Sequence, residues 1–268
     1  MKYLVSAIHY AARNWMLMLP VFVLTAIVNI IAGVSSAINS GIWSSLSGMN
    51  DYTDFKTVFT ALSAIFAAVV GSAVLALIAR LIYEPATYGL VNKSLETGNA
   101  GLNDIGAAIS GNFIKFVIYL VGMLVVGLVA SVAALLVWLL LKLIFSLLGA
   151  LGAVIMVILT IAIILFFIAL FIVLSFWFSA MVVDSLDVVA AAKKSIEVVK
   201  SCFWTILGVW LLVLIVCAVA SGILYFVTKI PLLGPIIYSV VPTVQYFVMA
   251  VFFLLIYREK TGRTNTGI

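Results

Sequence analysis

The sequence predicts an all-α, polytopic membrane protein: a transmembrane helical bundle in which residues 1–268 form a single integral membrane domain. Two observations carry this prediction. The chain is 66% hydrophobic and only 9% charged, whereas an ordinary soluble domain is about 25% charged. A soluble fold cannot bury so much apolar surface, so lipid must be the solvent for most of the chain. The apolar residues also form runs that reach the ~20 residues needed to cross a bilayer.

About six of these runs are expected to be spanning helices. The third and fourth come from one apolar region, which is too long for a single crossing at ~1.5 Å per residue. A Gly/Ser cluster at residues 146–152 predicts a tight outer turn between them, near residues 142–152. The expected spans are residues 15–34, 58–82, 113–141, 153–183, 203–227 and 236–257.

The segments between these spans carry turn and termination signals. Residues 35–57 are polar and are expected to form the one longer outer loop, which carries Asp51 and Asp54. Pro85 follows the second run, and the simplest interpretation is that it ends that helix. Pro231 and Pro235 bracket the turn that leads to the sixth run.

The lysines and arginines predict the orientation. With the N-terminus inside, eleven of the fourteen basic residues lie on the cytoplasmic side, and only Lys56, Lys142 and Lys229 lie outside. Cytoplasmic segments of membrane proteins carry an excess of Lys and Arg. We therefore expect a multi-pass protein of the cell membrane whose N- and C-termini are both cytoplasmic.

Three inner junctions share one pattern. In residues 6–19, 106–120 and 190–207, a short helix-prone stretch meets an aromatic residue (Trp15, Phe113 or Phe203) before a span begins. The pattern predicts three interfacial amphipathic helices, each followed by a transmembrane hairpin, in a three-fold pseudo-repeat. The alternative is that any such junction favours an amphipathic helix and an aromatic anchor.

The third junction has the clearest charge pattern. Lys193, Lys194 and Lys200 occupy positions apart from the apolar ones, which predicts contact with anionic lipid headgroups. Asp184 and Asp187, spaced by three, either bind a cation or cap the following helix. We favour the cap, because acidic residues interact well with helix N-termini.

Two of these inner segments resemble a known family. Residues 83–113 (YEPATYGLVNKSLETGNAGLNDIGAAISGNF) and 182–207 (VVDSLDVVAAAKKSIEVVKSCFWTIL) are similar to the junctions of a broad group of prokaryotic six-helix membrane proteins. That group includes the glycerophosphoryl diester phosphodiesterase membrane domain. The resemblance implies the same topology over the whole chain. In that family the phosphodiesterase chemistry belongs to a separate soluble domain, so the resemblance implies no catalytic residue here.

Residues that carry chemistry are sparse. His9, the one histidine, reads as an interfacial residue, and Cys202 and Cys217 lack the spacing of a metal site. No phosphate-binding loop or metalloprotease motif occurs. We expect no enzyme activity, no cofactor and no metal. The +5 net charge lies beside the spans, so it predicts a membrane surface rather than nucleic acid.

Polar groups at membrane depth are the remaining candidates. Arg80 and Glu84 are one turn apart at the inner end of the second span, where they are expected to pair. Gating or contact with a substrate is the sharper alternative. Asn29 and Gln245 are the candidates for a polar path, although hydrogen bonds between helices are the favoured explanation for both.

Three functional hypotheses follow. The leading one is a non-enzymatic protein with an accessory or envelope role, which binds lipid, a partner protein or a second copy of itself at its cytoplasmic rim. The second is a transporter or channel for a small neutral or amphiphilic solute. The third, a lipid-modifying enzyme, requires Asp184, Asp187, Glu84 and His9 to converge.

Overall fold

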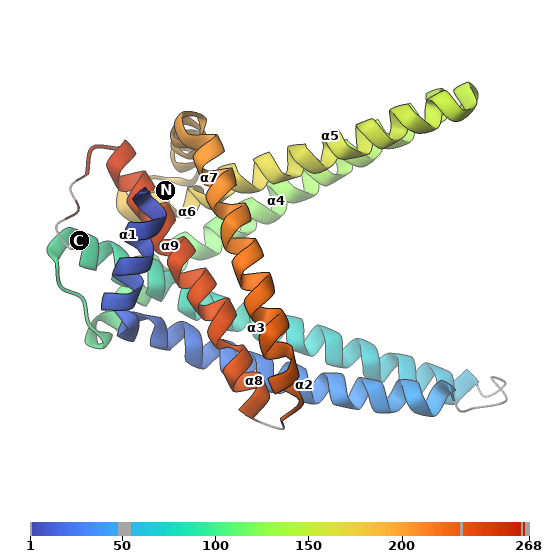
Figure 1. Ribbon diagram of the computed structural model, residues 1–268, viewed down its shortest axis with the longest axis horizontal. Helices are drawn as coiled ribbons and strands as arrows, with labels where there is room; N and C mark the ends of the chain where they lie inside the picture. The colour runs from blue at the N-terminus through green and yellow to red at the C-terminus, as the bar shows by residue number, and fades with distance from the viewer. Residues whose placement is uncertain (1, 48–54, 231–232, 264, 266–268) are drawn as a thin grey trace.

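The computed structural model describes residues 2–47, 55–230, 233–263 and 265. Helices joined by short turns make up this part of the chain, and it contains no strand, which confirms the predicted all-α class. The helices are α1 (Lys2–Arg13), α2 (Leu19–Ser47), α3 (Phe55–Thr97), α4 (Ile105–Phe145), α5 (Gly149–Ser175), α6 (Trp177–Val183), α7 (Val188–Leu224), α8 (Leu233–Tyr238) and α9 (Val240–Lys260) (Figure 1).

Two long arms leave a packed hub (Figure 1). The hub consists of α1, α6 and α9 together with the parts of α3, α4 and α7 that pack against them. One arm is the α2–α3 hairpin and the other is the α4–α5 hairpin, and the two diverge. A third hairpin is formed by α7 and α9, with α8 between them and against α2. The first and last described residues, Lys2 and Asn265, both bond to the end of α9 in the hub.

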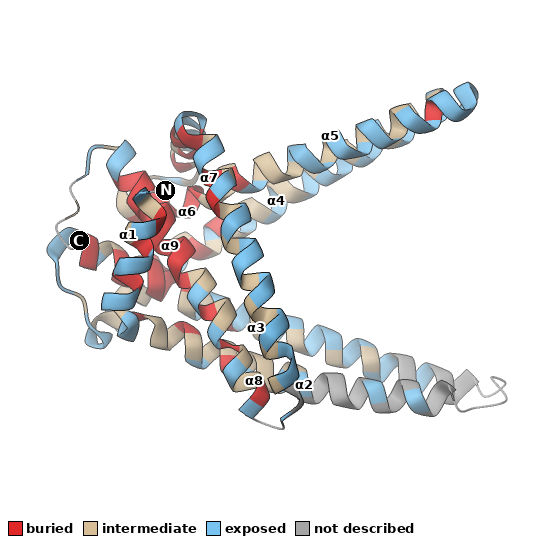
Figure 2. Ribbon diagram, viewed as in Figure 1, coloured by how far each residue is buried: buried red, intermediate tan, exposed pale blue. Residues whose placement is uncertain are grey.

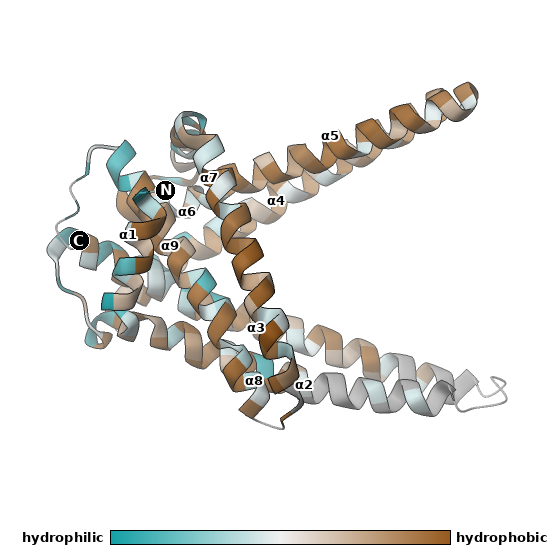
Figure 3. Cartoon of the chain, in the orientation of Figure 1, coloured by the Kyte–Doolittle hydropathy of each residue, from teal (hydrophilic) through white to brown (hydrophobic). Residues whose placement is uncertain are grey.

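The arms expose apolar side chains along most of their length (Figures 2 and 3). Leu143 near the tip of α4 is 75% exposed, and Ile158 on α5 is 61% exposed. Contiguous apolar surface of this extent is not stable in water but is suited to lipid. Five described segments are long and apolar enough to cross a membrane, and one of them, Leu102–Val183, contains both α4 and α5. The chain is therefore a multi-pass membrane protein.

The hub holds the buried core. α9 is buried on all sides from Phe247 to Arg258, as expected for a helix at the centre of a bundle. The amphipathic helix α1 places Leu4, Ala7 and Tyr10 against it. Lys2 Nζ and Tyr3 Oη both donate to Glu259 Oε1 at 3.0 Å. This contact with Glu259 raises the pKa of Lys2 and ties the start of the chain to the end of α9.

The structure corrects the expected end of the second helix. α3 does not stop at Pro85 but continues to Thr97, which makes it 43 residues long, or ~64 Å. That is about twice the thickness of the hydrocarbon core. The continuation is buried against the hub, with Ala86, Leu90 and Val91 fully covered. Membrane helices tolerate proline where neighbouring helices surround the backbone, and packing outweighs the lost hydrogen bond here.

The expected outer loop over residues 35–57 is also corrected. α2 extends to Ser47 and α3 begins at Phe55, and the two helices pack against each other. Helix formation satisfies the backbone polar groups of this stretch despite its serines. Residues 48–54, which include Asp51 and Asp54, lie outside the described residues.

The three inner junctions differ from one another. α1 is separated from α2 by a break at Asn14 (φ −113°, ψ 37°). α7 carries a kink at Cys202 (φ −144°, ψ 17°), which sets residues 188–201 apart from the span that follows. α4 runs through Phe113 without a break, so no separate interfacial helix precedes the third span. The three-fold pseudo-repeat stays a prediction.

Local interruptions of the backbone divide the long apolar regions into separate helices. The turn predicted near residues 142–152 is confirmed: α4 ends at Phe145, and Gly149 adopts a left-handed φ of 56°. The expected span 153–183 is divided at Phe176 into α5 and the buried α6. The expected span 236–257 begins with α8, which Ser239 separates from α9. The helices therefore differ in length from the expected spans where a long apolar run continues into the hub.

Candidate functional site

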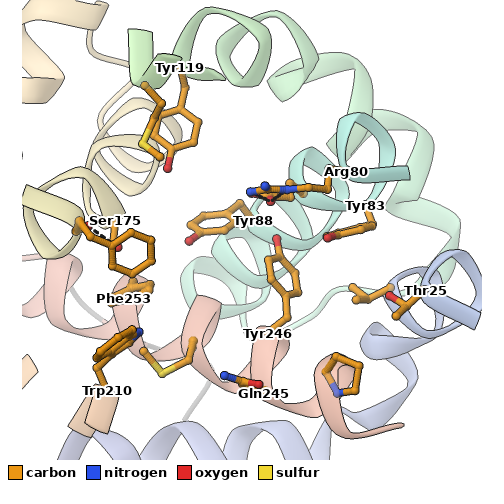
Figure 4. Close-up of a pocket in the computed structure, with 16 residues that line it drawn as sticks. Thr25, Arg80, Tyr83, Tyr88, Tyr119, Ser175, Trp210, Gln245, Tyr246 and Phe253 are labelled. Atoms are coloured by element: carbon orange, nitrogen blue, oxygen red, sulfur yellow. Dashed lines mark hydrogen bonds and ion pairs between the residues drawn. The ribbon is translucent and has the colours of Figure 1, made fainter. Parts of the chain in front are cut away.

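A pocket of about 430 Å³ lies where the hub meets the arms, and we call it the central pocket (Figure 4). Six helices contribute side chains to it, so no local stretch of sequence forms it. The polar lining comes mainly from α3, and the apolar lining comes mainly from α4, α5, α7 and α9. The lining residues are Val21, Thr25, Arg80, Tyr83, Glu84, Tyr88, Tyr119, Met123, Phe171, Ser175, Trp210, Pro242, Gln245, Tyr246, Met249 and Phe253.

An ion pair stands on the α3 wall of the central pocket. Arg80 Nε donates a hydrogen bond to Glu84 Oε1 at 2.7 Å, and Arg80 Nη2 makes an ion-pair contact with the same oxygen at 2.6 Å. The predicted pairing of these two residues is therefore confirmed. The Glu84 side chain is only 7% exposed, whereas that of Arg80 is 49% exposed. Both residues line the central pocket, and the guanidinium is the more exposed of the two charged groups.

One side of the Arg80 guanidinium has no protein partner among the described residues. Its Nε–Nη2 edge binds Glu84, and Nη1 bonds to no residue in the described part of the chain. A guanidinium carries five N–H donors in a planar fork, and a fork edge matches two oxygens of one anion. Charged residues at membrane depth are costly and usually functional. Arg80 is therefore the strongest binding candidate in the structure.

Four tyrosines line the central pocket together with Arg80. Tyr83 and Tyr88 come from α3, Tyr119 from α4 and Tyr246 from α9. Tyr246 points from α9 towards Arg80 and Tyr88 (Figure 4), and its ring packs edge-on against Tyr83 with centroids 5.0 Å apart. The Tyr246 hydroxyl is buried and has no hydrogen-bond partner among the described residues. Such a group costs free energy unless something bonds to it.

The group of four tyrosines was not predicted from the sequence. Tyr83 and Tyr88 flank Glu84, which is the only local signal. Tyr119 and Tyr246 reach the central pocket because α4 and α9 pack on α3. The spacing of residues in the sequence does not predict that packing.

The facing wall of the central pocket is apolar. Met123, Phe171, Trp210, Met249 and Phe253 make up most of it, and the one hydroxyl beside Phe253, that of Ser175, bonds the Phe171 carbonyl of its own helix (Figure 4). Figure 4 shows Trp210 and Phe253 on the side away from Arg80. The pocket therefore offers hydrogen-bond donors on one side and hydrocarbon contacts on the other, as ligand sites for amphiphiles do.

The two residues of the expected polar path lie in different places. Gln245 lines the central pocket, but Asn29 does not. Asn29 Nδ2 donates to Ser239 Oγ at 2.8 Å, and Ser239 Oγ donates to the Pro235 carbonyl at 2.6 Å. Asn29 thus makes the hydrogen bond between helices that was favoured for it, and it joins α2 to the break between α8 and α9.

A second, apolar groove of about 520 Å³ lies between α1, α7 and α9. Leu4, Ile8 and Trp15 form one side, and Leu212 and Val216 form the other. Gln245 lines this groove as well as the central pocket, so the two spaces share one wall on α9.

The two aspartates of the third junction have different roles. Asp187 accepts a hydrogen bond from the Ala190 amide at 2.9 Å and caps α7, as favoured. Asp184 is not part of that cap. Its carboxylate accepts from Tyr257 Oη at 2.6 Å and from Arg263 Nη2 at 2.8 Å. Within the described ranges, no group of three or more His, Cys, Asp or Glu residues is placed to hold a metal ion.

The remaining predicted site residues lie away from the central pocket. Lys193 and Lys200 are exposed on the first part of α7, and Lys194 pairs with Glu197 at 2.9 Å. His9 is exposed on α1. Of the four residues that a lipid-modifying enzyme requires, only Glu84 lines the central pocket.

No protein-family model, no curated protein and no solved structure matches this chain. The chemistry of the site therefore has to be read from its own residues.

Proposed function

We propose that this chain is a non-enzymatic membrane protein that binds a membrane lipid in the central pocket. The observation that supports the proposal is the composition of the two pocket walls. Arg80, four tyrosines and Gln245 offer polar contacts, while Met123, Phe171 and Trp210 offer apolar ones. A lipid has the same division between a polar headgroup and apolar chains. Because the exposed apolar arms lie in the bilayer, lipid molecules are present next to the pocket.

The proposal includes a topology. We propose that α2, α3, α4, α5, α7 and α9 cross the cell membrane and that the hub with both termini is cytoplasmic. The hydrophilic residues gather at the hub (Figure 3), and cytoplasmic segments carry the excess of Lys and Arg. In this arrangement the turn at Ser146–Leu148 lies outside, and the turn around Asn99 lies inside.

Cysteine labelling on intact cells tests the topology. Cys202 and Cys217 are replaced by alanine, and a single cysteine is placed at Ser146 or at Asn99. A membrane-impermeant maleimide is expected to label position 146 directly and position 99 only after permeabilisation. The reverse pattern contradicts the proposed orientation.

A cytoplasmic rim is part of the same proposal. Lys193 and Lys200 are exposed on one segment of α7 beside the hub, next to the half-buried Lys194. We propose that this face rests against anionic headgroups, which attract basic residues near the membrane surface. A partner protein or a second copy of the chain is the alternative occupant. Chemical crosslinking through these lysines distinguishes the occupants, because only the alternatives give a protein adduct.

Native mass spectrometry tests the lipid-binding function. Protein released from mild detergent is expected to retain a phospholipid-sized mass. Thr25→Trp and Met123→Trp each place an indole in the central pocket and are expected to remove that mass. Leu128→Trp, at a position of α4 that is 67% exposed, is the control and is expected to retain it. Absence of a bound lipid in the unmodified protein, or equal retention in all variants, contradicts the proposal.

Passage of the lipid is a second candidate, supported by the position of Gln245. Its side chain lines both the central pocket and the apolar groove between α1, α7 and α9. Proteoliposomes with a fluorescent phospholipid and a membrane-impermeant quencher measure this activity. Transport predicts that label from both leaflets is quenched and that Met123→Trp restores protection of the inner leaflet. If label in the inner leaflet stays protected from the quencher with the unmodified protein, transport is contradicted and lipid binding remains the only candidate function.

A further inference from the structure

We infer that the central pocket recognises the phosphodiester of a phospholipid, with Arg80 and Tyr246 as the residues that bind it. This inference rests on the proposed function, because it names the chemical group that the pocket recognises in the lipid. Three features of the site carry it: the free edge of a guanidinium, an unpartnered buried hydroxyl and the position of Arg80 at the end of the apolar part of α3.

The free edge of Arg80 selects an oxyanion. Both contacts to Glu84 come from Nε and Nη2 and end on the same oxygen, Oε1. The Nη1 side points away from that contact and is the side on which a further anion can be bound. Two oxygens of a phosphodiester match the spacing of two guanidinium N–H groups, which is why arginine is preferred for such bidentate contacts.

Glu84 acts as a positioning residue for Arg80. Its carboxylate is nearly fully buried, and it holds the guanidinium one helical turn away by a hydrogen bond from Nε and an ion-pair contact with Nη2. The guanidinium lies between the carboxylate and the proposed phosphate, so the two negative groups do not meet. The pair also keeps the empty site neutral, because a buried charge is costly unless it is paired.

Tyr246 supplies the second donor. Its hydroxyl lies in the central pocket with no partner among the described residues, and its ring is held by Tyr83. A phosphate on the free side of Arg80 accepts from this hydroxyl without displacing a protein hydrogen bond. Because Tyr246 belongs to α9 and Arg80 to α3, the bound phosphate joins the two helices.

The position of Arg80 fits a headgroup rather than a chain. It lies near the inner end of the apolar part of α3, just before the segment that is buried in the hub. Phosphates of the inner leaflet lie at that boundary, where interfacial residues meet the headgroups. The apolar wall around Trp210 and Phe253 then faces the acyl chains.

Titration of purified protein with short-chain lipids tests this inference. Phosphatidylglycerol and diacylglycerol with identical chains differ only in the phosphodiester headgroup. We expect Arg80→Gln to weaken phosphatidylglycerol binding about tenfold or more and Tyr246→Phe to weaken it about fivefold, as losses of charge-assisted hydrogen bonds do. Diacylglycerol binding is expected to be weak and unchanged in both variants. Arg13→Gln, at the exposed end of α1, is the charge-matched control and is expected to have no effect.

Two further experiments distinguish the possible outcomes. Arg80→Lys keeps the charge but loses the fork, so partial loss is expected, and it replaces Arg80→Gln if that variant does not fold. Inorganic phosphate is expected not to displace the lipid, and displacement identifies a site for free phosphate instead. Equal binding of both lipids with no effect of either variant overturns the phosphodiester inference alone. No binding of either lipid overturns the proposed function as well.

Discussion

Tyr257 donates a 2.6 Å hydrogen bond to Asp184 and so joins the buried end of α9 to the turn between α6 and α7. Tyr257 is fully buried, so Asp184→Ala leaves its hydroxyl without an acceptor, which costs about 1–3 kcal/mol of unfolding free energy. Arg263, which also bonds Asp184, is half-exposed, and Arg263→Gln is expected to cost less than about 1 kcal/mol. Thermal unfolding in detergent compares the two variants. Equal losses contradict the primary role of Tyr257.

Gly89 lies at a close contact between α3 and α4. A Cβ at this position lies 2.7 Å from Asn112 Nδ2 and 2.8 Å from Ala108 Cβ, so an added methyl group forces the helices apart. We expect Gly89→Ala to destabilise the protein by about 1–3 kcal/mol. Gly71→Ala on the same helix meets nothing within 4 Å, and it is expected to be neutral or slightly stabilising. The contact is refuted if both variants unfold at the same temperature.

Asn29 contributes to stability rather than to a polar path. Asn29→Leu removes its hydrogen bond to Ser239 between α2 and the start of α9, which is expected to cost about 1 kcal/mol. Ser72→Ala is the control, because its hydroxyl bonds only the Val69 carbonyl of its own helix. Lipid binding is expected to be unchanged in both variants. A selective loss of lipid binding in Asn29→Leu restores the polar-path interpretation.

Asp187 is expected to act as a helix cap with no direct role in binding. Asp187→Ala removes the acceptor for the Ala190 amide and is expected to cost about 1 kcal/mol. Asp187→Ser keeps a capping oxygen and is expected to recover most of that stability. If serine does not improve on alanine in thermal unfolding, the negative charge of Asp187 matters more than the cap.

The sequence could predict a structural feature where residues close together in the chain cause it. The pairing of Arg80 with Glu84 and the cap at Asp187 follow from spacings of four and three residues, which fix the geometry on a helix. The amphipathic pattern of α1 likewise reports its buried face. The continuation of α3 beyond Pro85 was missed, because its cause is the packing of Leu90 and Val91 in the hub.

The central pocket itself could be predicted only in part. Arg80 was identified because a charge near the end of an apolar run is visible in the sequence. Tyr119 and Tyr246 were not, since they are brought to Arg80 by helices that lie far apart along the chain. Asn29 and Gln245 look alike as polar residues within spans, and only tertiary structure separates a bond between helices from a pocket wall.

Photo-crosslinking tests the central claim, that the central pocket holds a phospholipid, most directly. A phospholipid with a diazirine on its acyl chain is added to the reconstituted protein, irradiated, and the labelled positions are mapped by mass spectrometry. We expect saturable labelling of Met123, Trp210 and Met249, which competes with unlabelled phospholipid and is lost in Thr25→Trp. Labelling of the arms is expected to be unsaturable, as for bulk lipid. Labelling of the pocket residues that is no more saturable than labelling of Leu143 and Ile158 on the arms would contradict the claim.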